Sequence, residues 1–177
     1  MRLFPLFALL LAALAGGCVV SKTPLAGLGE RAAPFASGTS FEIFERADAK
    51  AAWKPGEQKA VTFVGGADRI FRVVDAAGRT EDGTYTFHAV APGRYLVEAQ
   101  FSAERYGYAL LQVRGGEGLA SPLHCKDVDP AALQRAGLKM TADDCWLDSM
   151  ADPAGFLKEL AARAPEPRNR YVPVKKP

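Results

Sequence analysis

The residues of this chain best suited to chemistry are His124 and Cys125, which are adjacent in the sequence. A histidine beside a cysteine can activate the thiol as a nucleophile, and both residue types bind metals. Cys145 lies further along the chain, so the two cysteines could instead oxidise to a disulfide. Their spacing matches no zinc signature, and His88 is the only other histidine. A structural disulfide is the favoured interpretation, and a redox-active or metal-binding pair is the alternative.

Acidic residues gather around these cysteines, and their carboxylates could bind calcium or transfer protons. They are Asp127, Asp129, Asp143, Asp144, Asp148 and Asp152. The EF-hand arrangement, with its central glycine and terminal glutamate, is absent from this stretch. Asp129 and Asp152 each precede a proline, which is typical of a helix N-cap. Caps therefore account for two of these carboxylates without any metal.

Motifs for hydrolases, nucleotide-binding proteins and dehydrogenases are absent from the sequence: it has no G-x-S-x-G, P-loop, H-E-x-x-H or G-x-G-x-x-G. We therefore assign no catalytic residue, no metal ligand and no cofactor. The sequence indicates a protein that is not an enzyme.

The N-terminus carries the most specific pattern. Residues 1–2 are Met-Arg, residues 3–15 are almost wholly apolar, and residues 15–18 are Ala-Gly-Gly-Cys. A basic start, a short apolar run and small residues before a cleavage point are typical of a secretory signal peptide. A membrane span would need about 20 apolar residues. Residues 15–18 resemble the lipobox of bacterial lipoproteins, with the usual leucine displaced by one position to Leu14.

The lipobox resemblance implies that residues 1–17 are removed as a signal peptide and that Cys18 becomes the N-terminus. It also implies that Cys18 carries fatty acids such as palmitate on both its sulfur and its amine. Two acyl chains already anchor a protein stably. Val19 stands where lipoproteins retained at the inner membrane tend to have Asp. The resemblance thus implies an outer-membrane lipoprotein facing the periplasm, with the inner membrane as the alternative.

The rest of the chain divides by composition. Residues 18–39 are rich in Gly, Pro, Ala and Ser and predict a lipidated N-terminus followed by a flexible tether. Residues 40–164 predict a single β-rich domain with C-terminal helices. Residues 165–177 are Pro-rich and basic and predict a disordered tail. The body is mildly acidic, which argues against a nucleic-acid partner.

Cys125 and Cys145 are the only cysteines left in the mature chain once Cys18 is lipidated. In the oxidising compartment of exported proteins, such a pair usually forms a disulfide. Closing a loop of about 20 residues would stabilise the fold by roughly 3 kcal/mol.

Alternating apolar and polar residues, separated by turn residues, predict about six antiparallel strands in a sandwich or small barrel. The stretches are 41–45, 60–64, 70–74, 85–89, 95–101 and 108–113. Two short helices should follow, at 129–137 and from Asp152 to a stop at Pro165. Residues 114–122 predict a loop.

Residues 84–100 are similar to the strand-turn-strand element of transthyretin-like β-sandwiches. The match rests on Phe87, Pro92, Gly93 and Tyr95. The resemblance implies a sandwich and no particular function.

The fourth and fifth strands predict one buried face and one wet face. The side chains expected on the wet face are Thr86, His88, Glu98 and Gln100. We take this face as the possible binding face of a non-enzymatic binding or envelope-assembly module, whose partner would be an envelope protein or glycan. The alternatives are an inhibitor of a periplasmic hydrolase, presenting residues 114–122, and a hydrolase using the acidic residues near the disulfide.

Overall fold

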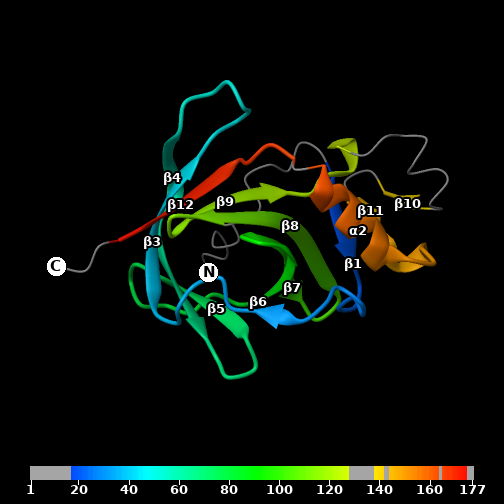
Figure 1. Ribbon diagram of the computed structural model, residues 1–177, viewed down its shortest axis with the longest axis horizontal. Coiled ribbons are helices and arrows are strands. Elements are labelled where there is room, and N and C mark those ends of the chain that lie inside the picture. The colour runs from blue at the N-terminus through cyan, green and yellow to red at the C-terminus, as the bar shows by residue number, and fades with distance from the viewer. Residues whose placement is uncertain (1–16, 128–137, 142–143, 164, 175–177) are drawn as a thin grey trace, which may run out of the picture.

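The structure is a computed structural model that describes residues 17–127, 138–141, 144–163 and 165–174. Eight antiparallel strands close into a barrel (Figure 1). The strands are β3 (Thr39–Glu45), β4 (Lys54–Gly65), β5 (Ile70–Asp75), β6 (Thr84–Ala91), β7 (Arg94–Ser102), β8 (Arg105–Arg114), β9 (Glu117–Pro122) and β12 (Asn169–Pro173). The expectation of a mainly β fold is confirmed. The architecture is a barrel, not the sandwich that the transthyretin-like element implied, and it has eight strands, not six.

Strands β3 to β8 contain all six predicted stretches, and each pairs with its neighbour in sequence. Such hairpins depend on local turns, which the sequence marks clearly. The turn at Pro92 and Gly93 joins β6 to β7, and Gly93 adopts a φ of 67°, which favours glycine.

Closure of the barrel depends on two strands that the sequence did not predict. Strand β12 lies between β3 and β9, with Tyr171 opposite Ile43 on one side and Gly118 on the other, and β9 pairs with β8. The prediction of a disordered tail over 165–177 is therefore wrong for β12. The prediction of a loop over 114–122 is wrong for β9. Each strand is short and pairs with strand edges that would otherwise lack hydrogen-bond partners.

The barrel interior is an aromatic core. Rings pack at short range, with the centroids of Phe35 and Phe41 4.6 Å apart and those of Phe71 and Phe87 5.3 Å apart. Its buried members are Phe35, Phe41, Ile43, Val61, Phe63, Phe71, Val73, Phe87, Val97, Ala109, Leu111, Ala120 and Tyr171. Side chains therefore fill the interior of this small barrel.

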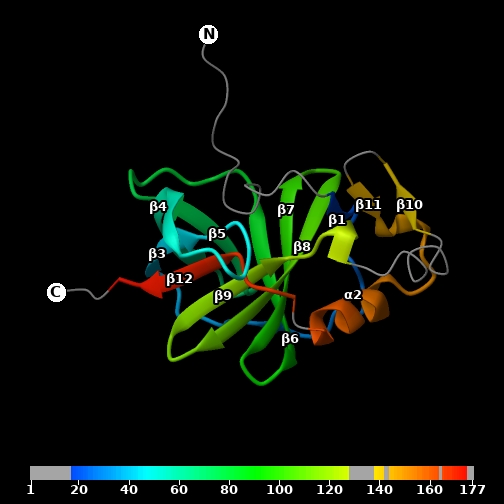
Figure 2. The ribbon, with the colours of Figure 1, turned by 90° about the horizontal axis from the view of Figure 1, so that it is seen from above.

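A second region, which we call the flank, lies beside the barrel (Figures 1 and 2). It consists of β1 (Cys18–Ser21), β11 (Asp144–Trp146), β10 (Lys139–Met140), η1 (Cys125–Asp127), η2 (Leu147–Ser149) and α2 (Pro153–Ala162). Strand β1 runs parallel to β11 and antiparallel to β8, so the flank extends the sheet. One further short strand, β2 (Arg31–Ala32), belongs to neither region and pairs with β6.

The prediction of a flexible tether over 18–39 is wrong. Val19 and Val20 are both 0% exposed. Val19 donates its N–H to the Leu123 carbonyl at 3.0 Å, so β1 is held within the sheet. Two adjacent β-branched residues suit a strand buried on both faces. The Gly, Pro and Ala around them conceal that signal.

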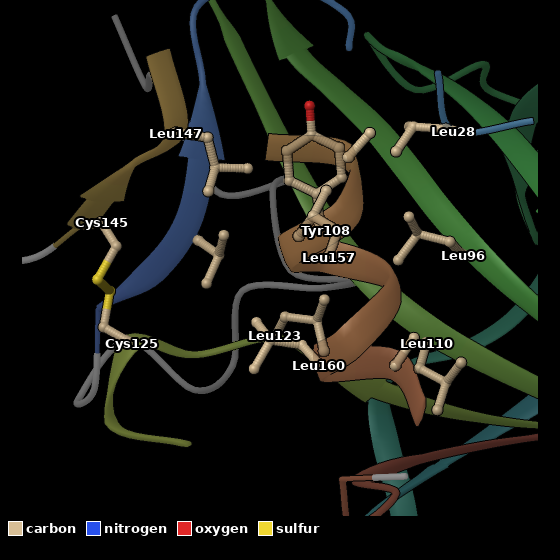
Figure 3. Close-up of a cluster of buried hydrophobic side chains, with 13 residues drawn as sticks. Leu28, Leu96, Tyr108, Leu110, Leu123, Cys125, Cys145, Leu147, Leu157 and Leu160 are labelled. Carbon is tan, nitrogen blue, oxygen red and sulfur yellow. A yellow bond between two sulfur atoms is a disulfide. The ribbon is translucent and has the colours of Figure 1, made fainter. Parts of the chain in front are cut away.

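The helix expected from Asp152 is confirmed as α2. The Asp152 carboxylate accepts the Gly155 N–H at 2.9 Å, and Pro153 occupies the first turn. The apolar stripe of α2 packs with β7 and β8 in a leucine-rich core (Figure 3). Its buried members are Val19, Leu28, Leu96, Tyr108, Leu110, Leu123, Cys125, Cys145, Leu147, Ala154, Leu157, Leu160 and Ala161. The helix predicted at 129–137, with its cap Asp129, lies outside the described residues.

The expected disulfide is confirmed: Cys125 and Cys145 are bonded, with their Cα atoms 5.8 Å apart. The bond ties η1 to β11 and borders the leucine-rich core (Figure 3). It thus links the segment that follows β9 to β11 in the flank.

Candidate functional site

The face that the sequence predicted to be wet is covered. Thr86, His88 and Glu98 are 6%, 7% and 7% exposed, and only Gln100 of the four is partly exposed. The chain that follows β1 crosses this face, and the Leu25 N–H bonds to Glu98 Oε2 at 2.9 Å. The prediction of an exposed face is therefore wrong for three of its four residues.

These buried polar groups form one connected network. Glu98 Oε2 also accepts the Tyr108 hydroxyl at 3.3 Å, and Glu98 Oε1 accepts the Thr86 hydroxyl at 3.4 Å. Thr86 Oγ1 lies 3.2 Å from His88 Nε2, and His88 Nδ1 lies 3.0 Å from the Gly29 carbonyl oxygen. Burial raises the pKa of Tyr108 well above its usual range, so its hydroxyl stays protonated. We call this group the polar clamp, because it holds residues 25–29 on the sheet.

One signal in the sequence could have revealed that this face is covered. Leu96 lies on the same face of β7 as Glu98, and Leu110 lies opposite Leu96 on β8. Both leucines are 0% exposed and belong to the core beneath α2. Large apolar residues among polar ones therefore marked a face that packs against another element.

The acidic residues near the cysteines do not come together as a site. Asp144 is buried and pairs with the Arg105 guanidinium at 2.8 Å. Asp148 accepts the Lys22 N–H at 3.0 Å, and Asp152 caps α2. Asp129 and Asp143 lie outside the described residues, and the side chain of Asp127 is likewise not described. Within the described parts of the chain, no three His, Cys, Asp or Glu side chains are placed to hold one metal ion.

His124 lies at the end of β9 and is 1% exposed. Its neighbour Cys125 is bonded to Cys145, so the thiol is not available as a nucleophile. His124 instead lines a groove of about 290 Å³. We call it the α2 groove, and its described lining is Leu123, His124, Leu160, Arg163, Pro165, Glu166 and Arg168.

The α2 groove lies where the helix ends and the chain turns toward β12. Hydrogen bonds fix this turn against the barrel: Arg168 N–H donates to the Ala120 carbonyl at 2.9 Å, and the Ser121 hydroxyl donates to the Pro165 carbonyl at 2.7 Å. From the β3–β4 loop, Arg46 Nε donates to the Pro167 carbonyl at 2.8 Å. The groove therefore has a fixed frame.

Two guanidinium groups give the α2 groove its charge. Arg163 is 48% exposed in its side chain and pairs with Glu159 at 2.5 Å. Arg168 Nη1 donates to the Ala47 carbonyl at 2.9 Å. A guanidinium has five N–H donors, so both groups retain donors for a ligand. Sequence reasoning missed this site because it assigned Arg168 to a disordered tail.

The barrel interior offers little room by comparison. An apolar cavity of about 30 Å³ lies among the aromatic rings, lined by residues such as Phe63, Phe87 and Tyr171. Apolar cavities of this kind stay dry, and ligand sites are usually about ten times larger or more. The α2 groove is the better candidate for a binding site.

Cys18, the residue that the lipobox resemblance marks, is the first residue of β1 and is half-buried. Its backbone N–H lies 3.3 Å from Asp144 Oδ1. Burial, and next the charge of Asp144, raise the pKa of its thiol, while Arg105 opposes them. The described residues include no helix that is both long and apolar enough to cross a membrane.

No protein-family model matches the chain, and neither a curated protein nor a solved structure matches it significantly.

Proposed function

We propose that this protein is a lipid-anchored binding module of the bacterial cell envelope. Acyl chains on Cys18 hold it at the outer membrane, facing the periplasm, and the α2 groove binds an anionic group of an envelope ligand. The observation that carries the proposal is the pair of guanidinium groups, Arg163 and Arg168, that line a groove of about 290 Å³.

The guanidinium donors in the groove favour an anion. Among the described lining residues, Arg163 and Arg168 are opposed by Glu166, and Glu159 also pairs with Arg163. The C-terminal end of α2 adds about half a negative charge, so the attraction of an anion depends on direct hydrogen bonds from the guanidinium groups and not on an excess of positive charge. A planar guanidinium can bind a carboxylate or phosphate through two parallel hydrogen bonds. The exposed pair between Arg163 and Glu159 is weak enough for a ligand to compete with it.

The same geometry supports binding more than catalysis. Acid–base hydrolysis of a glycoside needs two carboxyl groups beside the substrate. The described lining of the α2 groove contributes one, Glu166. The inhibitor alternative needed a protruding loop at 114–122, where the chain instead forms the paired strands β8 and β9.

The ligand chemistry is tested by nuclear magnetic resonance titration of the protein with sodium acetate and with inorganic phosphate. Sodium chloride at equal ionic strength is the reference. We expect acetate or phosphate to shift the amide signals around Arg163, Glu166 and Arg168 in a saturable manner. Which of the two binds more tightly distinguishes a carboxylate ligand from a phosphate ligand.

The variant Arg163→Gln with Arg168→Gln should weaken this binding about tenfold or more, since it removes charged hydrogen bonds. The matched control is Arg72→Gln with Arg114→Gln, which removes the same charge from exposed positions on β5 and β8. Equal weakening by both variants, or shifts no larger than those with chloride, would contradict the proposed site.

The anchor has a separate test. Cys18→Ser should release the protein from membranes and leave residues 1–17 attached. An intact mass with an unmodified N-terminus at another residue would rule out lipidation.

A further inference from the structure

No flexible linker separates Cys18 from the folded domain, because Cys18 is the first residue of β1. It is itself paired in the sheet, opposite Asp144 on β11 and bridged to His124 on the other side. The next two residues, Val19 and Val20, are fully buried. Lipid attached to Cys18 would therefore hold the domain directly at the bilayer, unless β1 left the sheet and exposed both valines.

The register of β1 and β11 shows which face the anchor leaves. Paired residues in adjacent strands point to the same side of a sheet, and successive residues alternate. Val19 pairs with Cys145, and both point into the leucine-rich core. The side chains of Cys18 and Trp146 therefore point to the opposite face, together with the buried Val20 and Asp144, and of these four Cys18 and Trp146 are the ones that are partly exposed.

Trp146 lies close to the anchor. It pairs with Val20, two residues beyond Cys18 along β1, a distance of about 7 Å along the strand. The Trp146 side chain is partly exposed. Tryptophan is enriched at membrane–water interfaces, where its ring is partly in the apolar layer and its N–H remains hydrated.

A basic group accompanies this tryptophan. Arg105, at the start of β8, pairs with Asp144, and its side chain is 37% exposed. Asp144 shares a face of β11 with Trp146, so the guanidinium lies beside the same face. There it can meet the phosphate groups of lipids.

We infer that the face of β1 and β11 carrying Cys18 and Trp146, here called the anchor face, rests on the bilayer, with Trp146 in the interfacial layer. The inference depends on the proposed lipidation of Cys18. It places the flank next to the membrane, and we expect the β3–β4 end of the barrel, at the other end of the molecule from the flank, to lie farther from it (Figures 1 and 2).

The chain provides its own control for this orientation, because it has two tryptophans. Trp53 precedes β4 in the β3–β4 loop, where the Arg46 guanidinium lies 4.5 Å from its ring centroid. It is partly exposed, like Trp146, but lies in the loop between β3 and β4 and not in the flank. Trp53→Phe leaves Trp146 as the reporter, and Trp146→Phe leaves Trp53.

The experiment uses the processed lipoprotein in vesicles of phosphatidylethanolamine and phosphatidylglycerol, with brominated acyl chains as the fluorescence quencher. We expect the Trp53→Phe protein to lose most of its emission relative to unbrominated vesicles. The Trp146→Phe protein should lose almost none. Equal quenching of the two variants would overturn the orientation.

A tether variant tests whether the short connection causes the orientation. About 12 Gly and Ser residues placed after Cys18, followed by Ser at the position that Cys18 occupied in β1, would allow a reach of about 20 Å. Quenching of Trp146 should then fall toward the level of Trp53. Unchanged quenching would show that the anchor face binds lipid without help from the short connection. It would contradict the inference that the absence of a linker after Cys18 causes the orientation.

Flotation of the same vesicles separates the two proposals. If the processed protein does not float with the vesicles, the lipid anchor itself is wrong and the orientation falls with it. If the protein floats but Trp146 is not quenched, the anchor stands and the orientation is wrong. Circular dichroism of each variant confirms that the comparison is made between folded proteins.

Discussion

The barrel and the flank are built by different means. Six consecutive strands of the barrel pair with their sequence neighbours around an aromatic core. The flank joins segments far apart in the chain, with Cys18 and Asp144 separated by 126 residues, around a leucine-rich core with a disulfide at its border. The barrel depends on local turns, whereas the flank depends on long-range contacts and a covalent link. The two regions should therefore respond differently to substitution.

The largest effect is expected in the barrel. Phe41 is fully buried, and its ring centroid lies 4.6 Å from that of Phe35 and 6.0 Å from that of Phe63. Phe41→Ala should lower the free energy of unfolding by about 3–5 kcal/mol, because it removes a large side chain from a packed core. The half-buried Phe44 on the same strand is the control, and Phe44→Ala should cost clearly less. Equal losses in urea denaturation would contradict the inward packing of Phe41.

Removing the disulfide should weaken the flank in particular. Cys125→Ser with Cys145→Ser should lower the free energy of unfolding by about 3 kcal/mol. Hydrogen exchange should accelerate most at the Val19 amide, which bonds to Leu123 next to the bridge. Cys18→Ser, which leaves the bridge intact, is the control. Equal acceleration throughout β5 and β6 would show that barrel and flank open as one unit.

The polar clamp joins the two regions and should have an intermediate effect. Glu98→Leu leaves the Leu25 N–H without its acceptor, while the Tyr108 hydroxyl keeps the Ser21 hydroxyl oxygen at 2.6 Å, and the change should cost about 1–3 kcal/mol. Exchange at the Leu25 amide should accelerate more than exchange at the barrel amides. Glu104→Ala, an exposed change in the β7–β8 turn, should have almost no effect. A neutral result for Glu98→Leu would mean that the leucine-rich core alone holds residues 25–29 in place.

The smallest effect is expected at the start of α2. Asp152→Ala removes the carboxylate that accepts the Gly155 N–H and should cost about 1 kcal/mol. The exposed change Glu159→Ala should stay within about 0.5 kcal/mol. Thermal unfolding followed by circular dichroism measures both. A loss at Glu159 as large as that at Asp152 would argue against the cap.

The sequence predicted what local physics determines. Alternation and turn residues located β3 to β8, and Asp152 with Pro153 located the start of α2. The expectation of an oxidising compartment, together with the lone pair of cysteines, predicted the disulfide. In each case, the deciding residues are neighbours in the chain or limited to a single pairing.

What the sequence did not predict depends on distant partners. Val19 and Val20 form a strand only because β8 and β11 provide edges for them. Tyr171 is buried only because β3 and β9 lie on either side of it. Alternation placed Glu98 on the correct side of β7. The residues that cover that side, 25–29, are distant from β7 in the sequence, so alternation could not reveal them. The α2 groove was missed for the same reason, because its frame joins β9, α2 and the tail.

The position of β12 has a consequence for how the protein matures. The strand that closes the barrel is the last described element of the chain, and it fills the gap between β3 and β9. A chain that emerges N-terminus first carries these two unpaired strand edges until β12 has emerged. Such edges readily pair with other chains. Folding therefore includes an interval in which the barrel is open to association, and loss of β12 would make that state permanent.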